Sequence, residues 1–276
     1  MSGARMVDSP HQSEDTVEPD DAVSPPTGSA PSADRSLFSG LGDLGRNAAR
    51  LTGVDGAAIA LLTESTGVRD LVRATDAMSY HLDELQFTLG EGPCLDVFSP
   101  AGSPQLVPDM GDEVARRRWP VFTAEARAVG VQAVFAFAVT AGTRPLGVLE
   151  LYRRSAGALT EDEAHVAALC AESVATTIAQ NWDAVIAHLG PGSDAAHVAE
   201  WLAAGEVVAQ GANSRAQVYV ASGMVAAQLK IPTTEAMARL RAHAYQTGRS
   251  IKDVADDIVT RRLDTRGTFD GTEADR

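Results

Sequence analysis

The 276-residue sequence has little of several residue classes, and each shortage excludes a class of protein. Its two cysteines, Cys94 and Cys170, are too few for a disulfide scaffold or a structural zinc site. The longest apolar stretches, residues 131–139 and 146–152, are much shorter than the roughly 18–20 residues that a membrane helix needs. The N-terminus is acidic and proline-rich and lacks the basic and apolar regions of a secretion signal. We therefore expect a cytoplasmic protein with no membrane partner.

Basic residues are also scarce. The chain has 23 basic and 37 acidic residues, which gives a formal net charge of −14. The scarcity is uneven along the chain. Residues 1–36 carry two basic and seven acidic side chains, whereas residues 215–263 carry eight basic and four acidic ones. A small basic module thus follows an acidic region. This asymmetry favours an anionic partner for the basic part, with ordinary drift in the charge of a small helical domain as the alternative.

Length and composition fit two globular domains with tails. Hydrophobic residues make up 45% of the chain, which is enough for a sizeable core. At roughly 100–200 residues per domain, the length indicates two domains. Residues 1–34 are rich in Ser, Pro, Asp and Ala and have few large apolar side chains, so we predict a disordered acidic tail there.

Residues 35–189 predict an α+β domain. Its apolar spacing indicates a first helix that ends near Gly53 and a short strand at residues 105–107. Two hairpins are expected, one from residues 56–62 and 68–75 and the other from residues 131–140 and 146–152. The prediction is an antiparallel sheet of about five strands flanked by helices, including short ones at residues 80–88 and 119–129.

A long helix is predicted to close this domain. Thr160 and Glu163 have the spacing of a capping box, and apolar residues then recur every three or four positions as far as Trp182. Residues 190–214 predict a helical linker, in which a helix at residues 194–209 extends the apolar stripe through Trp201. Helices at domain ends commonly form dimer seams, so we expect a homodimer.

Three helical patterns fill residues 215–263, and residues 264–276 read as a frayed C-terminal tail. Residues 217–263 resemble the ANTAR domain, a three-helix RNA-binding module of transcription antitermination regulators. The resemblance rests on five segments: Ala221-Ser222-Gly223-Met224-Val225, residues 235–244, Arg249-Ser250-Ile251, Asp253-Val254-Ala255 and Ile258-Val259.

The preceding domain is similar to GAF domains, which sense small molecules or mediate dimerisation. The similarity rests on four features: Gly90-Glu91-Gly92-Pro93-Cys94, Arg118-Trp119-Pro120, Gly147-Val148-Leu149 and the helix that follows Thr160. The order GAF then ANTAR is common in actinobacterial regulators. The resemblance implies a GAF-like α+β domain followed by an all-α three-helix ANTAR bundle. It further implies a protein that is not an enzyme and that binds paired RNA hairpins in nascent transcripts, which prevents a terminator from forming.

Six side chains of the bundle are the candidate RNA contacts: Arg239, Arg241, His243, Tyr245, Arg249 and Lys252. Arginine can bind phosphate with two hydrogen bonds, and tyrosine or arginine can stack on an unstacked base. Their spacing alone favours a solvated helix face, and Lys252 could instead pair with Asp256. The resemblance to ANTAR domains favours RNA binding and makes Arg241 the strongest candidate.

Small residues in the bundle suggest either close packing or the approach of RNA, and they are Ala221, Gly223, Ala236, Ala244 and Ala255. Glycine costs a helix about 1 kcal/mol relative to alanine, so Gly223 needs such a reason. In the GAF-like domain, one set of residues is a candidate pocket for an unknown small-molecule ligand, with ordinary core as the alternative: Phe87, Cys94, Trp119, Phe122, Phe135 and Phe137.

Two other functions stay open. The bundle could dock a protein partner instead of RNA, although its positive charge weakly disfavours this reading. Cys94 follows a Gly-Pro turn at a predicted helix start, where a thiolate would be stabilised, so a cysteine-based redox sensor or enzyme is a further alternative. Cys170 lies on an apolar helix face and reads as core. The six histidines lack metal-ligand spacing, and we expect neither a metal nor a cofactor.

Overall fold

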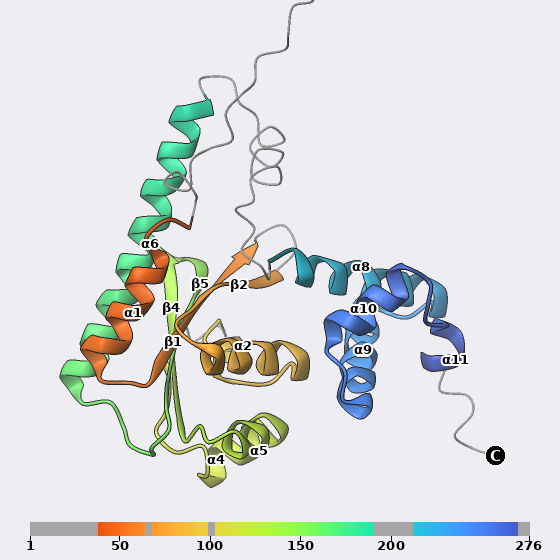
Figure 1. Cartoon of the computed structure of the whole chain (residues 1–276), viewed down its shortest axis with the longest axis horizontal. Helices are drawn as coiled ribbons and strands as arrows, with labels where there is room; N and C mark the ends of the chain where they lie inside the picture. Colours follow the sequence, from red (N-terminus) through yellow and green to blue (C-terminus); the bar gives the residue numbers. More distant parts are fainter. Residues whose placement is uncertain (1–37, 64–67, 99–102, 190–211, 270–276) are drawn as a thin grey trace, which may run out of the picture. The chain divides into compact units, whose positions relative to one another are not determined.

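The computed structural model describes residues 38–63, 68–98, 103–189 and 212–269 (Figure 1). All of these residues belong to one compact unit of the chain, Pro31–Arg276. The acidic tail predicted for residues 1–34 and the helix predicted for residues 194–209 lie outside the described residues.

The first domain is built on a five-stranded antiparallel sheet, as the sequence predicts. Its strands are β1 (Gly56–Thr63), β2 (Val68–Ala74), β3 (Gln105–Val107), β4 (Ala133–Ala141) and β5 (Arg144–Arg153). They lie in the order β2-β1-β5-β4-β3. The two predicted hairpins, β1–β2 and β4–β5, are confirmed, and β5 joins them at the centre of the sheet through its pairing with β1.

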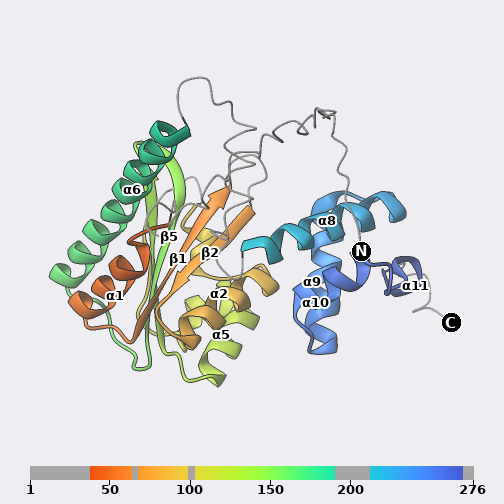
Figure 2. The ribbon, with the colours of Figure 1, turned by 45° about the horizontal axis from the view of Figure 1, so that its top comes forward.

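Helices α1 (Leu41–Thr52) and α6 (Glu161–Leu189) cover one face of the sheet (Figure 2). The apolar stripe of α6 packs against the sheet and α1, and its members there are Val166, Cys170, Val174 and Ile178. Trp182, the last member of the stripe, remains 41% exposed. Most of the periodicity from which the sequence predicts a dimer seam therefore serves the core of this domain.

The other face carries α2 (Ala77–Leu89) and α5 (Pro120–Ala128) (Figure 2). The short helices α3 (Pro93–Asp96) and α4 (Glu113–Arg118) pack into the cores on this face through Cys94 and Ala115. Helix α2 begins three residues before the predicted position because Asp76 caps it. Helix α4 was not predicted. Its sequence, EVARRR, contains only two apolar residues, so it has no apolar period to detect.

The C-terminal helices are α8 (Ala212–Leu229), α9 (Thr233–Thr247) and α10 (Ile251–Val259), which confirms the predicted bundle. The sequence predicts a frayed tail from residue 264. This is wrong for residues 265–269, because Thr265–Phe269 forms a short additional helix, α11. Phe269 is 6% exposed and packs into the bundle core, and the Thr265 hydroxyl hydrogen-bonds to Gln228. This burial explains why the segment is ordered.

Side-chain hydrogen bonds fix the first turns of α6 and α2, one helix on each face of the sheet. The capping box is confirmed: the Thr160 amide donates to Glu163 (2.8 Å) and the Glu163 amide donates to the Thr160 hydroxyl (3.2 Å). Asp76 accepts the amides of Met78 and Ser79 at the start of α2. Within the described ranges, no helix is long and apolar enough to cross a membrane.

Candidate nucleic-acid interface

The bundle has a core of alanines that lets its helices approach closely. Ala221 on α8, Ala236 and Ala244 on α9, and Ala255 on α10 are fully buried. Gly223 differs from them, because it is partly exposed and an added Cβ would have no neighbour within 4 Å. Packing among the described residues therefore does not explain this glycine, and the approach of RNA to it stays a prediction.

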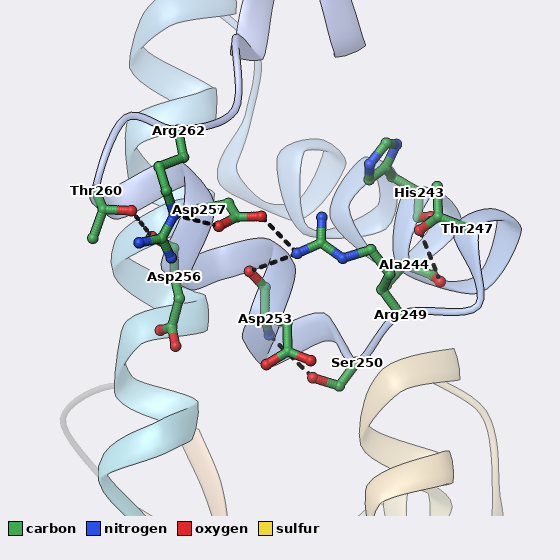
Figure 3. A network of polar contacts seen from close by, with 10 residues as sticks. All are labelled: His243, Ala244, Thr247, Arg249, Ser250, Asp253, Asp256, Asp257, Thr260 and Arg262. Carbon is green, nitrogen blue, oxygen red and sulfur yellow. Dashed lines mark hydrogen bonds and ion pairs between the residues drawn. The ribbon is translucent and has the colours of Figure 1, made fainter.

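A network of charged side chains joins Arg249, in the loop between α9 and α10, and Arg262, just after α10, to Asp257 of α10 (Figure 3). The Arg249 guanidinium donates to the Asp257 carboxylate (2.6 Å), and Arg262 donates to the other oxygen of the same carboxylate (2.7 Å). Hydrogen bonds from these two arginines lower the pKa of Asp257. The Ser250 hydroxyl accepts the Asp253 amide (3.0 Å) and so caps α10. Arg249 precedes the N-cap residue Ser250, and this network holds its guanidinium beside the Asp253 carbonyl and the Asp257 carboxylate of α10.

Two further candidates pack against the end of the bundle. Arg239 pairs with Glu235 (2.6 Å) and also donates to the carbonyl of Phe269. The His243 ring lies edge-on to the Phe269 ring, with 5.3 Å between the centroids. Burial, and then the positive charge of Arg249, lower the pKa of His243, so its imidazole is mainly neutral near pH 7. Lys252 is exposed, and the described part of the chain gives it no ion pair, with Asp256 or any other acid.

Arg241 and Tyr245 lie against the first domain. The Arg241 Nε donates to the carbonyl oxygen of Phe87 on α2 (3.2 Å), and the Tyr245 hydroxyl donates to Glu125 on α5 (3.2 Å). The hydrogen bond to Glu125 raises the pKa of Tyr245. The six candidates are therefore not gathered on one free surface, since two of them already contact the first domain.

The same contact buries a basic residue to which the sequence assigns no role. Arg215 on α8 is 2% exposed and pairs with Asp83 and with Glu84 (2.5 Å), both on α2. Its guanidinium carbon lies 4.2 Å from the centroid of the Phe87 ring, a cation–π geometry. Phe87 itself is 2% exposed and belongs to the core cluster of the C-terminal bundle. Because Arg215 and Asp83 are 132 residues apart, no local sequence pattern could have found this site.

The candidate ligand pocket is corrected by the structure, because its six residues lie in four separate clusters. Phe87 packs with the bundle, and Trp119 and Phe122 pack between α5 and the sheet. Cys94 belongs to a third, smaller cluster that contains none of the other five candidates. Phe135 and Phe137 point to the opposite face, into the core beneath α1 and α6. The alternation of side chains along β4 explains this separation, since Val134 and Ala136 take the other face.

Cys94 lies beside an acid in the interior of the first domain. Its fully buried thiol donates to Glu150 on β5 (2.5 Å), which is 3% exposed. Gln86 on α2 donates to the same carboxylate oxygen (2.5 Å) and accepts the Cys94 amide (2.9 Å). A nucleophilic cysteine needs a positive and accessible environment, and this thiol is fully buried beside an acidic side chain. The arrangement ties α2 to the sheet through polar contacts.

Comparison with known proteins assigns the two domains. The family model of the GAF domain matches residues 41–179, about half of the chain. The chain belongs to the GAF domain family. The family model of the ANTAR domain matches residues 208–259, which include α8, α9 and α10. The chain thus combines a GAF domain with an ANTAR domain behind it, and the resemblance seen in the sequence is confirmed.

Several solved GAF domains are similar to the first domain. One comes from a phosphoenolpyruvate-protein phosphotransferase of Coxiella burnetii, with 17% identity, 54% of this chain and 85% of that chain covered, and a TM-score of 0.43. Another is the GAF domain of the Acinetobacter phosphoenolpyruvate-protein phosphotransferase, with 15% identity, 54% and 85% covered, and a TM-score of 0.41. A GAF domain/HD domain protein from Geobacter sulfurreducens has 15% identity, 52% and 93% covered, and a TM-score of 0.42. No curated protein gave a significant match.

Proposed function

We propose that this protein is a cytoplasmic, non-catalytic transcription antitermination regulator. Its ANTAR domain binds paired RNA hairpins in a nascent transcript, and its GAF domain controls that binding. The observation that carries the proposal is the ANTAR match, which falls on three packed helices with eight basic and four acidic side chains between residues 215 and 263. Such helices supply positive charge for phosphates and side chains that can stack on loop bases.

The structure supports specific roles for three candidates on α9 and α10. Lys252 is exposed to solvent, so its ammonium group can reach an RNA phosphate. The Arg249 side chain extends along α10 to Asp257, near the end of that helix, so a phosphate that binds Arg249 must compete with the Asp257 carboxylate. His243 presents an imidazole suited to stacking on a base or donating to one.

The GAF domain is the proposed sensory and dimerising part. Dimerisation has a candidate contact in Trp182, which the domain leaves 41% exposed towards the end of α6. The six residues first considered as a ligand pocket do not form one cavity, so they support no ligand class. The buried Cys94–Glu150 contact disfavours the cysteine-based alternative, since the thiol donates to a carboxylate.

RNA binding is tested by electrophoretic mobility shift of the full chain on a library of two-hairpin RNAs at several salt concentrations. We compare the wild type with Lys252→Ala and with Arg116→Ala, a control that removes an exposed positive charge from α4 of the GAF domain. Loss of one phosphate contact should weaken binding to all target RNAs and make the log–log salt slope shallower by about 1.

The control variant should bind as the wild type does. Saturable, salt-sensitive binding that weakens in Lys252→Ala alone would support the proposal. A folded wild-type chain that binds no RNA at any salt concentration, and that keeps a salt-insensitive contact with a protein partner, would favour the protein-docking alternative instead.

A further inference from the structure

The contact between the GAF and ANTAR domains is charged and closely packed. On the ANTAR side it consists of Arg215, Arg241 and Tyr245, and on the GAF side the matching groups are Asp83, Glu84, Glu125 and the backbone at Phe87. Gly90, which ends α2 with a φ of 71°, lies directly beneath Arg241. A Cβ at Gly90 would lie 2.5 Å from the Arg241 Nη1, so the guanidinium rests against bare backbone.

This contact occupies groups that RNA would need. The Arg241 Nε donates to a carbonyl and the Tyr245 hydroxyl donates to a carboxylate, so these two donor atoms must leave the GAF domain before they can bind a phosphate or a base. The GAF domain places three carboxylates against the bundle, at Asp83, Glu84 and Glu125, and these supply the kind of charge that RNA phosphates carry. GAF carboxylates and RNA therefore compete for overlapping positive charge.

We propose that the GAF helices α2 and α5 act as an anionic competitor of RNA, which holds the ANTAR domain closed until the contact through Arg215 and Arg241 is released. The inference rests on the proposed function and adds its regulation. In the closed state RNA meets only part of the binding surface, and in the open state Arg241 and Tyr245 join it.

The composition of the contact suits a switch. A buried ion pair gains little net stability, because the cost of removing two charges from water offsets most of their attraction, yet it specifies one arrangement. The apolar part of the contact includes Phe87, whose ring lies 6.2 Å from that of Tyr219. A contact of this kind is specific but readily opened, as a two-state element must be if a signal is to shift its population.

The test opens the contact from the GAF side, so that the ANTAR domain keeps all its side chains. In Phe87→Ala the ring beneath Arg215 and beside Tyr219 is removed, with no change of charge. In Glu84→Lys a repelling charge faces Arg215, and circular dichroism and thermal unfolding of each variant check that it is folded. The matched control is Glu113→Lys, the same charge change at a 68%-exposed position of α4. The four full-length proteins are titrated onto one two-hairpin RNA by fluorescence anisotropy.

We expect Phe87→Ala and Glu84→Lys to bind RNA about tenfold more tightly than the wild type, which corresponds to moving a mostly closed population to a mostly open one. The control should change affinity by no more than about twofold, because exposed charges are screened. Hydrogen exchange of the α2 and α9 amides provides a readout without RNA and should speed up in the two opened variants.

Three outcomes would overturn the inference. Equal RNA affinity of the wild type and both opened variants would leave RNA binding standing but remove the competition. An equal gain in Glu113→Lys and Glu84→Lys, without a gain in Phe87→Ala, would assign the effect to charge alone. Absence of RNA binding by all four proteins, with faster exchange in the opened variants, would keep the domain contact but refute the proposed function and its regulation together.

Discussion

Asp76 is the side chain whose removal should most damage the GAF domain through lost polar contacts. One of its carboxylate oxygens accepts the amides of Met78 (2.8 Å) and Ser79 (2.9 Å) and the hydroxyl of Tyr152 (3.1 Å). The other oxygen accepts the hydroxyls of Thr75 (2.7 Å) and Ser79 (2.9 Å). The residue thus caps α2 and joins that helix to the central strand β5.

Asp76→Ala should lower the free energy of unfolding of the GAF domain by about 3 kcal/mol. Loss of an N-cap costs about 1 kcal/mol. The Ser79 and Tyr152 hydroxyls, in residues that are 1% and 3% exposed, would lose an acceptor, and each costs about 1 kcal/mol more. The suitable assay is urea unfolding of the full chain, followed by far-ultraviolet circular dichroism and tryptophan fluorescence, since Trp119 is buried in this domain.

The dependence on pH gives an independent check. Burial by itself would raise the pKa of Asp76, but hydrogen bonds from Ser79, Thr75 and Tyr152 outweigh it and hold the pKa below its ordinary value of 3.8. A carboxyl whose folded-state pKa is lowered stabilises the fold above the unfolded value and loses that contribution as the pH falls through the folded value. The gap between wild type and variant should therefore be constant from pH 5 to 7 (roughly the range above both pKa values) and narrow below pH 3.8.

A matched control separates the cap from ordinary surface charge. In Asp43→Ala the variant loses an acid that pairs with Arg46 (2.6 Å) at side chains 74% and 65% exposed, so its stability should change by less than about 0.5 kcal/mol. If Asp76→Ala also loses less than about 0.5 kcal/mol, or if its gap to the wild type widens in acid, the reasoning from the hydrogen bonds is refuted.

Further predictions concern both domains. Burial, and then the Asp76 carboxylate, raise the pKa of Tyr152 to about 12, so its contribution to stability should be present below pH 10 and lost as the pH rises through about 12; Tyr152→Phe should remove this step in alkaline unfolding curves. Gly223→Ala should stabilise the ANTAR domain by about 1 kcal/mol in thermal unfolding, and a simultaneous fall in RNA affinity would indicate that RNA approaches this position. Ser250→Ala should lose the α10 cap and about 1 kcal/mol, measured in the same way. Trp182→Ser should weaken self-association in sedimentation, and a wild type that is monomeric at all concentrations would end the dimer proposal.

Local patterns predicted the elements of both domains well, because these elements are set by signals that lie within a few residues. The capping box of Thr160 and Glu163 marked the start of α6, and the apolar spacing of the bundle marked α8, α9 and α10. Helix α4 was not predicted from the sequence, because a short exposed helix shows no apolar period. Helix α11 was not predicted either, because its order depends on the burial of Phe269 in the core formed by α8, α9 and α10.

The candidate pocket failed for a different reason. Aromatic residues in a small domain are mostly core, and which core they enter depends on strand parity and on which helix covers each face. Phe135 and Phe137 alternate with Val134 and Ala136, so they face α1 and α6, and proximity in sequence to the other candidates has no bearing on this. Phe87 enters the core of the other domain.

Charge counting treated the basic side chains of the ANTAR region as equally available, and the structure shows why they are not. Four of the eight, Arg215, Arg239, Arg249 and Arg262, are ion-paired with carboxylates. Arg215 is the least accessible of the four to an RNA phosphate, because it is buried against acids of the GAF domain. If RNA binds this region as proposed, a phosphate must displace an existing acid at several positions, so the net charge alone does not set the affinity. A movement of the GAF domain would change this competition only at Arg215, because the acids paired with Arg239, Arg249 and Arg262 lie within the ANTAR domain.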